Sequence, residues 1–300
     1  YFSRYLSIIG WSLPCAIVLF ASNACLRGAG DTITPMIAMI VVDLINALVS
    51  FSLVRGWFGL PAMGFDGIAI GTAVGYACGA TIVTAVLLSG SGRLRLYRHR
   101  LRPHLHTLRR MFRIGLPAGA ESTIQWVANF ALVIMINRID NASAAAHLNA
   151  IRLEAFSYLP GFGFAIAASA LVGQSLGMKD AERARRCAHL AYAMGGSVMG
   201  VLGLIFVLMG RTIASVLSDD PQVIELTGVC LRYAGVIQTM FAAALIYGSA
   251  LRGAGDTTGV MLFNLSSILL IRLLGVFVLA EEIGRARVGK ECRSRWSPYH

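Results

Sequence analysis

The residues that could do chemistry are polar side chains inside otherwise apolar stretches. Asp43 lies ten residues into one such stretch, about 15 Å along a helix. Asn46 and Ser50 follow at spacings that place all three on one helical face. A carboxylate beside an amide and a hydroxyl can hold a proton or a small cation. Because a charge at that depth costs several kcal/mol unless it meets a cavity or a partner, we interpret the group as a candidate ion site. An aspartate that only joins helices is the alternative.

Glu121 and Gln125 form a second polar pair, one helical turn apart and shortly after Pro117. Their depth in the apolar stretch suits a cavity, and Glu121 also fits a position nearer the cytoplasmic mouth. A functional and a structural interpretation stay equally open for this pair. Asn264, in a later apolar stretch, is expected to hydrogen-bond between helices rather than to bind a ligand.

The composition of the sequence indicates the class of protein in which these polar residues are held. The 300 residues are 56% hydrophobic and 14% charged, whereas about a quarter of the residues in a soluble domain are charged. The net charge of +11 comes from arginines between apolar runs, which is typical of cytoplasmic loops rather than of a nucleic-acid-binding surface. The sequence has no phosphate loop, no nucleophile elbow, no zinc motif and no paired cysteines. We therefore expect a polytopic membrane protein, and neither an enzyme nor a bound cofactor.

Eight apolar runs are long enough to span a membrane, at about 20 residues each. They cover residues 5–26, 33–55, 67–90, 113–138, 143–171, 184–209, 222–250 and 258–280. The arginines of segment 91–113 predict a cytoplasmic connection. The expected organisation is three helices in 1–90, an arginine-rich linker in 91–112, five helices in 113–280, and a polar tail in 281–300.

A heptapeptide occurs twice, at residues 26–32 and again 225 positions later at 251–257. Its glycines predict a sharp turn, and its Arg and Asp need water or each other. Each copy alone is typical of a solvated turn between helices, and the duplication indicates two related halves. Six predicted helices separate the copies, so both turns should be cytoplasmic and the repeat parallel, with six helices per half. The candidate motif residues are Arg27, Gly28, Gly30, Asp31, Arg252, Gly253, Gly255 and Asp256.

Small residues and prolines predict how the helices pack. Glycines recur every four residues at Gly67, Gly71, Gly75 and Gly79, and again at Gly196 and Gly200, so that neighbouring helices can approach closely. Pro160, Gly161 and Gly163 form the strongest candidate for a kink that lines a cavity. A bend that serves packing alone explains the same residues as well.

If the two halves match, three helices precede Tyr1 and one follows Ala280. The charged residues 281–300 do not suit a final apolar helix. We therefore expect a truncation or a change of reading frame near residue 280, with a short polar tail as the alternative.

Four stretches together resemble the multidrug and toxic compound extrusion (MATE) family of secondary antiporters, in its bacterial NorM-like branch. They are residues 26–36, Gly115-Leu-Pro117 with Glu121, residues 160–164 through 171–177, and residues 251–257. The resemblance implies a MATE-like all-α bundle of two facing six-helix lobes, of which this chain holds about eight transmembrane helices, the fourth to the eleventh. It implies alternating access and export of amphipathic, often cationic compounds, driven by Na⁺ or H⁺. It also implies a monomer in the lipid bilayer of a bacterial inner membrane.

The resemblance also suggests coupling residues. The family's fifth helix carries Asn-x-x-x-Asp; here Asn46 matches the asparagine, and Ser50 stands at the aspartate. Asp43, one turn earlier, is expected to substitute. Several relatives have an acidic residue where this chain has Gln125, and Glu121 lies one turn before it. The expected coupling carboxylates are therefore Asp43 and Glu121. A flippase for lipids or lipid-linked sugars from the same superfamily, and a non-functional truncated remnant, are the alternatives.

Overall fold

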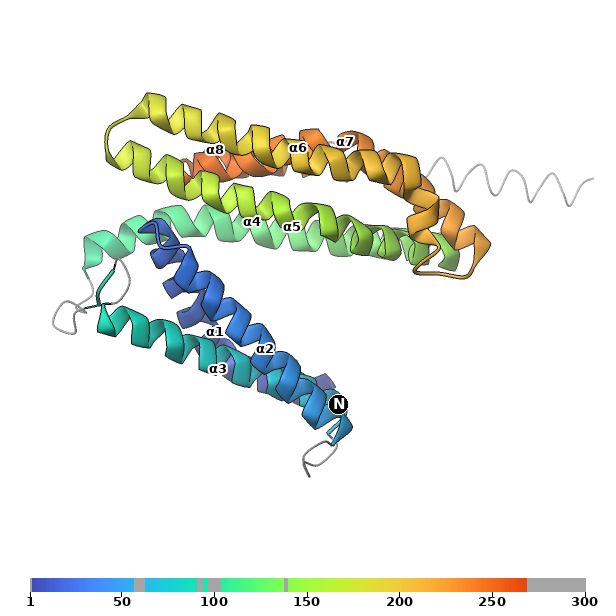
Figure 1. Ribbon diagram of the computed structural model, residues 1–300, viewed down its shortest axis with the longest axis horizontal. Helices are drawn as coiled ribbons and strands as arrows, with labels where there is room; N and C mark the ends of the chain where they lie inside the picture. The colour runs from blue at the N-terminus through green and yellow to red at the C-terminus, as the bar shows by residue number, and fades with distance from the viewer. Residues whose placement is uncertain (1, 57–62, 91–93, 97–103, 138–139, 269–300) are drawn as a thin grey trace, which may run out of the picture. The chain divides into compact units, whose positions relative to one another are not determined.

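The structure is a computed structural model that describes residues 2–56, 63–90, 94–96, 104–137 and 140–268 (Figure 1). Within these ranges the regular secondary structure is helical throughout. The helices are α1 (Phe2–Gly28), α2 (Ile33–Arg55), α3 (Phe65–Ser89), α4 (Leu105–Asn137), α5 (Asn141–Gly177), α6 (Ala181–Ala214), α7 (Pro221–Gly253) and α8 (Thr257–Ser266). The expected all-α fold is thereby confirmed.

Helices α1 to α7 are long and apolar enough to cross a membrane, judged by length and composition. Large apolar side chains such as Trp11, Trp126 and Leu208 are 72–85% exposed, as a surface facing lipid tails would require. Of the eighth predicted span, 258–280, the described residues include only the first part, as α8. The polar tail 281–300 lies outside the described residues.

The helix ends differ from the apolar runs because polar turns extend several helices beyond them. α4 begins at Leu105 rather than near residue 113, so that Arg109 and Arg113 are helical and exposed. Four helices start at an aspartate whose side chain accepts a hydrogen bond from a backbone N–H of the first turn. These N-caps are Asp140 for α5, Asp180 for α6, Asp220 for α7 and Asp256 for α8.

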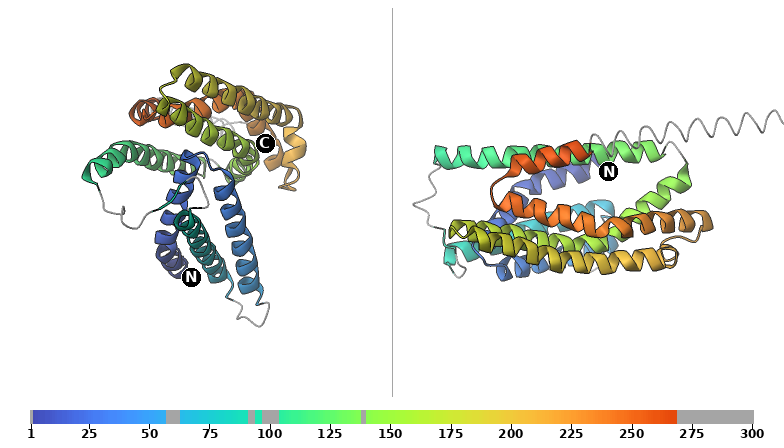
Figure 2. Two further views of the ribbon diagram at one scale, coloured as in Figure 1. Left: turned by 60° about the vertical axis from the view of Figure 1, so that its left-hand side comes forward. Right: turned by 90° about the horizontal axis from the view of Figure 1, so that it is seen from above.

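The described helices divide into two compact units, one within Tyr1–Pro103 and the other within His104–His300. In the first, Leu19 and Leu26 of α1 pack with Val42 of α2 and Val83 of α3. In the second, α5, α6 and α7 lie side by side, and α8 lies against α4 (Figure 2). The assignment of these parts as lobes and linker stays a prediction.

The glycines of α3 allow the close packing that their spacing predicted. A Cβ atom at Gly71 would lie 2.8 Å from the backbone nitrogen of Ser50, and one at Gly75 would lie 3.1 Å from the carbonyl oxygen of Val42. On α6 the closest approach is displaced from the predicted pair, because a Cβ atom at Gly203 would lie 2.6 Å from the carbonyl oxygen of Gly235 in α7. Gly200 faces only a methyl group of Thr239, at 3.1 Å.

Candidate functional site

Both copies of the heptapeptide form the same turn between two helices. In the first copy, the N–H of Gly30 bonds the carbonyl of Arg27, and the N–H of Asp31 bonds that of Leu26. The second copy repeats these bonds from Gly255 to Arg252 and from Asp256 to Leu251. This is a Schellman ending, in which the residue after the helix is left-handed. Gly30 and Gly255 have φ values of 87° and 95°, which explains the glycine at that place.

The aspartate of each copy accepts a hydrogen bond from the first turn of the next helix; Asp256 is the N-cap of α8, whereas Asp31 comes one residue before Thr32, the N-cap of α2. Asp31 Oδ1 accepts from the N–H of Thr34 at 3.0 Å, and Asp256 Oδ1 accepts from that of Gly259 at 2.9 Å. The two arginines differ. Arg27 is half-buried and has no ion pair with any described residue, whereas Arg252 contacts a carboxylate of another helix. The duplicated sequence thus has the same turn geometry in both copies and two different environments for its arginine.

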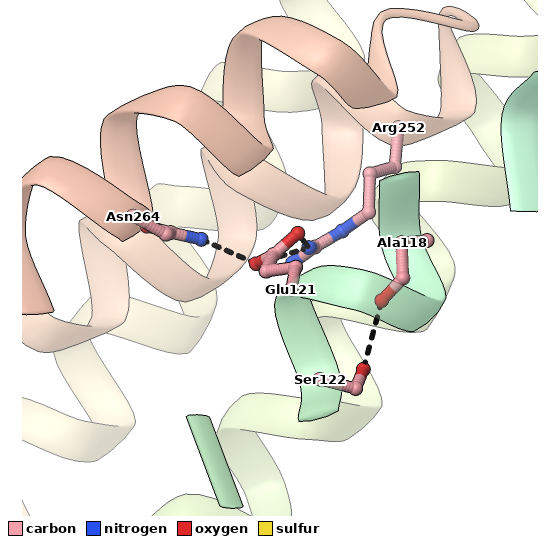
Figure 3. Close-up of polar contacts among 5 residues, drawn as sticks. All are labelled: Ala118, Glu121, Ser122, Arg252 and Asn264. Carbon is pink, nitrogen blue, oxygen red and sulfur yellow. Dashed lines mark hydrogen bonds and ion pairs between the residues drawn. The ribbon is translucent and has the colours of Figure 1, made fainter. Parts of the chain in front are cut away.

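The partner of Arg252 is Glu121, one helical turn after Pro117 in α4. Arg252 Nη1 donates to both carboxylate oxygens of Glu121 at 3.0 Å, and Asn264 Nδ2 donates to Oε1 at 2.6 Å. Figure 3 shows the Glu121 carboxylate between the Arg252 and Asn264 side chains. Glu121 is 8% exposed. Three helices of the second unit, α4, α7 and α8, therefore meet at one buried carboxylate, which we call the Glu121 cluster.

The geometry of the Glu121 cluster decides what it can bind. Arg252 balances the charge of Glu121, and Arg252 and Asn264 together donate three hydrogen bonds to its oxygens. A cation or a proton at this carboxylate must therefore compete with the guanidinium of Arg252. Such competition would weaken the link between α4 and the end of α7. The predicted hydrogen bond of Asn264 to another helix is confirmed. Gln125, one turn further along α4, is exposed.

The Asp43 group is only partly assembled in the structure. Ser50 Oγ donates to Asn46 Oδ1 at 2.9 Å, and both residues face the glycines of α3. Asp43 is exposed on its own unit. The structure therefore joins the amide and the hydroxyl to each other and leaves the carboxylate accessible. The ion-binding role of all three residues stays a prediction.

The Pro160 segment lies within the continuous helix α5. A Cβ atom at Gly161 would lie 3.2 Å from Leu245 of α7 and would also collide with Met199 of α6. Gly163 faces open space, because no atom lies within 4 Å of its would-be Cβ. Gly161 thus serves the contact between α5, α6 and α7, and a role of Pro160 and Gly163 in a cavity stays a prediction.

Sequence reasoning missed the pairing of Arg252 with Glu121, which are 131 positions apart. The available signal was an arginine at the end of an apolar helix, which required some partner. Sequence reasoning also missed a hydrogen bond between His189 of α6 and Tyr247 of α7, at 2.9 Å. No spacing rule connects residues on separate helices.

Comparison with known proteins identifies the fold. The profile of the MatE family matches residues 1–52 and 117–278. The chain belongs to the MatE family. This MatE-family chain is 29% identical over 280 residues to a "Probable multidrug resistance protein NorM" of Thermotoga maritima, covering 93% of the chain and 60% of the relative. It is 30% identical over 265 residues to a protein of the same name from Brucella suis, covering 85% and 56%.

Solved MATE structures have the same fold at low sequence identity. The structure of a MATE in the straight conformation matches with a TM-score of 0.82 at 17% identity, covering 89% of this chain and 60% of that one. An outward-facing multidrug resistance MATE family transporter of the MOP superfamily matches with a TM-score of 0.80 at 16% identity, covering 89% and 59%. The MatE-family chain is therefore an integral membrane protein that spans about three-fifths of the length of the curated relatives it matches.

Proposed function

We propose that this MatE-family chain is part of a cation-coupled multidrug efflux antiporter of a bacterial inner membrane. It exports amphipathic, often cationic compounds by alternating access, in exchange for Na⁺ or H⁺. Support comes from family membership and from relatives that carry the name multidrug resistance protein. The supporting observation inside the chain is the Glu121 cluster, because a buried carboxylate at a junction of helices can respond to a cation.

Ion binding is coupled to helix movement when a proton or Na⁺ replaces Arg252 as the partner of the Glu121 carboxylate. With Arg252 bound, the carboxylate ties α4 to the end of α7 and, through Asn264, to α8. A proton or Na⁺ on Glu121 weakens the attraction for Arg252 and so loosens the link between α4 and the end of α7. Asp43 is the second coupling candidate, because its carboxylate is accessible and lies close in sequence to the Asn46–Ser50 pair.

Efflux of a fluorescent organic cation from membrane vesicles that carry the full-length gene product tests this proposal. We expect Asp43→Asn or Glu121→Gln to abolish ion-dependent efflux, because each removes a titratable group and retains the side-chain shape. Glu225→Gln is the matched control, since Glu225 is an exposed carboxylate near the start of α7. If both variants pump as well as the control, neither residue couples transport. If the unsubstituted protein fails to move the dye under any ion gradient, the proposed efflux function is wrong.

A further inference from the structure

A polar and aromatic group on α6 and α7 shares no residue with the Glu121 cluster. His189 Nδ1 is 2.9 Å from the hydroxyl of Tyr247, and the ring centroids of Tyr192 and Tyr247 are 5.0 Å apart. His189 is exposed, whereas the two tyrosines are half-buried. The side chains therefore hold one another in place at a surface that stays accessible.

The depth of this group follows from the charges along α6. Four basic residues precede it, at Lys179, Arg183, Arg185 and Arg186, and residues 187–210 contain no Asp, Glu, Lys or Arg. At 1.5 Å per residue, His189 is about 5 Å beyond the last of these charges, and Tyr247 is about 8 Å before Arg252 at the end of α7. Both side chains thus lie where a charged helix end meets an apolar span, which is the depth of lipid headgroups and of interfacial tyrosines.

One basic side chain lies in line with the group. Arg185 precedes His189 by four residues and Tyr192 by seven, so all three share a face of α6. Arg185 is exposed and has no ion pair among the described residues. Glu182, one turn earlier, pairs with Arg186 at 3.3 Å. The guanidinium of Arg185 is therefore available to an external anion.

The hydrogen bond between His189 and Tyr247 leaves one proton donor available in either tautomer. If the Tyr247 hydroxyl donates to Nδ1, the other ring nitrogen Nε2 carries a proton on the exposed side. If Nδ1 carries the proton and donates it to Tyr247, the tyrosine hydroxyl proton is available instead. A guanidinium one turn from a neutral donor suits a phosphate group, which accepts several charge-assisted hydrogen bonds.

We propose that Arg185, His189 and Tyr247 bind the phosphate of an anionic phospholipid, and that the ring of Tyr192 packs against the lipid below its headgroup. Charge complementarity and depth both favour a lipid, because basic residues at the end of an apolar span attract anionic headgroups. This site is independent of the proposed transport activity, and binding is measured without any transport.

Thermal unfolding of the purified chain in nanodiscs tests the proposal. In phosphatidylcholine nanodiscs, added phosphatidylglycerol is expected to raise the midpoint of unfolding in a concentration-dependent manner, because a ligand that binds only the folded state stabilises it. Arg185→Gln should weaken the apparent affinity for phosphatidylglycerol about fivefold, since a basic residue near an anionic surface contributes about 1 kcal/mol. Tyr247→Phe should also weaken it, because the hydroxyl that orients His189 is lost while the ring contact with Tyr192 is kept.

Arg183→Gln is the matched control. Arg183 has the same charge and is also exposed, and two residues before Arg185 it lies on the opposite side of α6. Unchanged lipid dependence in Arg183→Gln, with reduced dependence in Arg185→Gln and Tyr247→Phe, supports the site. An equal loss in Arg183→Gln would show a diffuse charge effect and overturn the proposal. An equal shift from inorganic phosphate in pure phosphatidylcholine, or no shift from phosphatidylglycerol, would also overturn it.

Discussion

Glu121 illustrates how a polar residue is accommodated in an apolar unit. Its carboxylate is 8% exposed and accepts hydrogen bonds from Arg252 and Asn264, which come from two other helices. Removing one member of a buried ion pair leaves the other charge unbalanced, which costs more than the intact pair contributes. Substitution of Arg252 tests the cost of an unbalanced charge, because the Glu121 carboxylate would then accept a hydrogen bond only from the amide of Asn264, among the described residues.

Arg252→Gln should destabilise the chain by about 1–3 kcal/mol, because it leaves a buried carboxylate without its cation. Solvent screens the partly exposed arginine, and this keeps the expected cost below that of a fully buried pair. Arg27→Gln is the matched control at the same motif position, where no ion pair with a described residue exists, and it should change stability by less than about 0.5 kcal/mol. Unfolding titrations of both variants, together with Glu121→Gln and the double mutant of Glu121→Gln with Arg252→Gln, give the coupling energy. Equal costs in the two arginine variants would contradict the assigned pair.

At the level of helices, seven of the eight apolar runs predicted helices long enough to span a membrane, because a stretch of about 20 apolar residues has few other stable structures there. The helix ends were less predictable, since α4 continues through Arg109 and Arg113 outside its apolar run. The glycine spacing of α3 predicted close packing, because all its members lie on one helix. The Gly203–Gly235 contact was not predictable, because it joins two helices with no common spacing.

The two heptapeptides predict unequal tolerance to the same substitution. A Cβ atom at Gly253 would lie 2.8 Å from the Cα of Ser169 in α5, whereas one at Gly28 would meet no such neighbour within 4 Å. Gly253→Ala should cost about 1–3 kcal/mol through overpacking. Gly28→Ala should be neutral or stabilise by up to ~1 kcal/mol, through helix propensity. Thermal unfolding of the two variants in one detergent measures this difference, and similar midpoints would refute it.

For the molecule as a whole, the number of helices between the two heptapeptide turns predicts whether both turns lie on the same side of the membrane. Six helices, α2 to α7, separate the two turns, and an even number of crossings returns the chain to its starting side. The prediction that both turns are cytoplasmic rests on this count and on the arginines between the helices. The membrane itself lies outside the structure, so sidedness has to be measured.

Ala29→Cys and Ala254→Cys, each in a cysteine-free background, place one thiol in each turn. We expect a membrane-impermeant maleimide to label both from the cytoplasmic side and neither from the other side. Labelling from opposite sides would exclude a parallel repeat, and labelling of both from the outside would reverse the predicted orientation.

The heptapeptides also bear on how duplicated segments diverge. Gly30 and Gly255 both adopt the left-handed conformation of the turn, and Asp31 and Asp256 both accept a hydrogen bond from a backbone N–H of the next helix. In the second copy, Arg252 also pairs with a carboxylate, and Gly253 also packs against a neighbouring helix. Among the described residues, Arg27 has no such ion pair, and a Cβ atom at Gly28 would meet no neighbour within 4 Å. Identical residues in the two copies are therefore under different structural constraints. The effect of a substitution in one copy does not predict its effect at the matching position of the other.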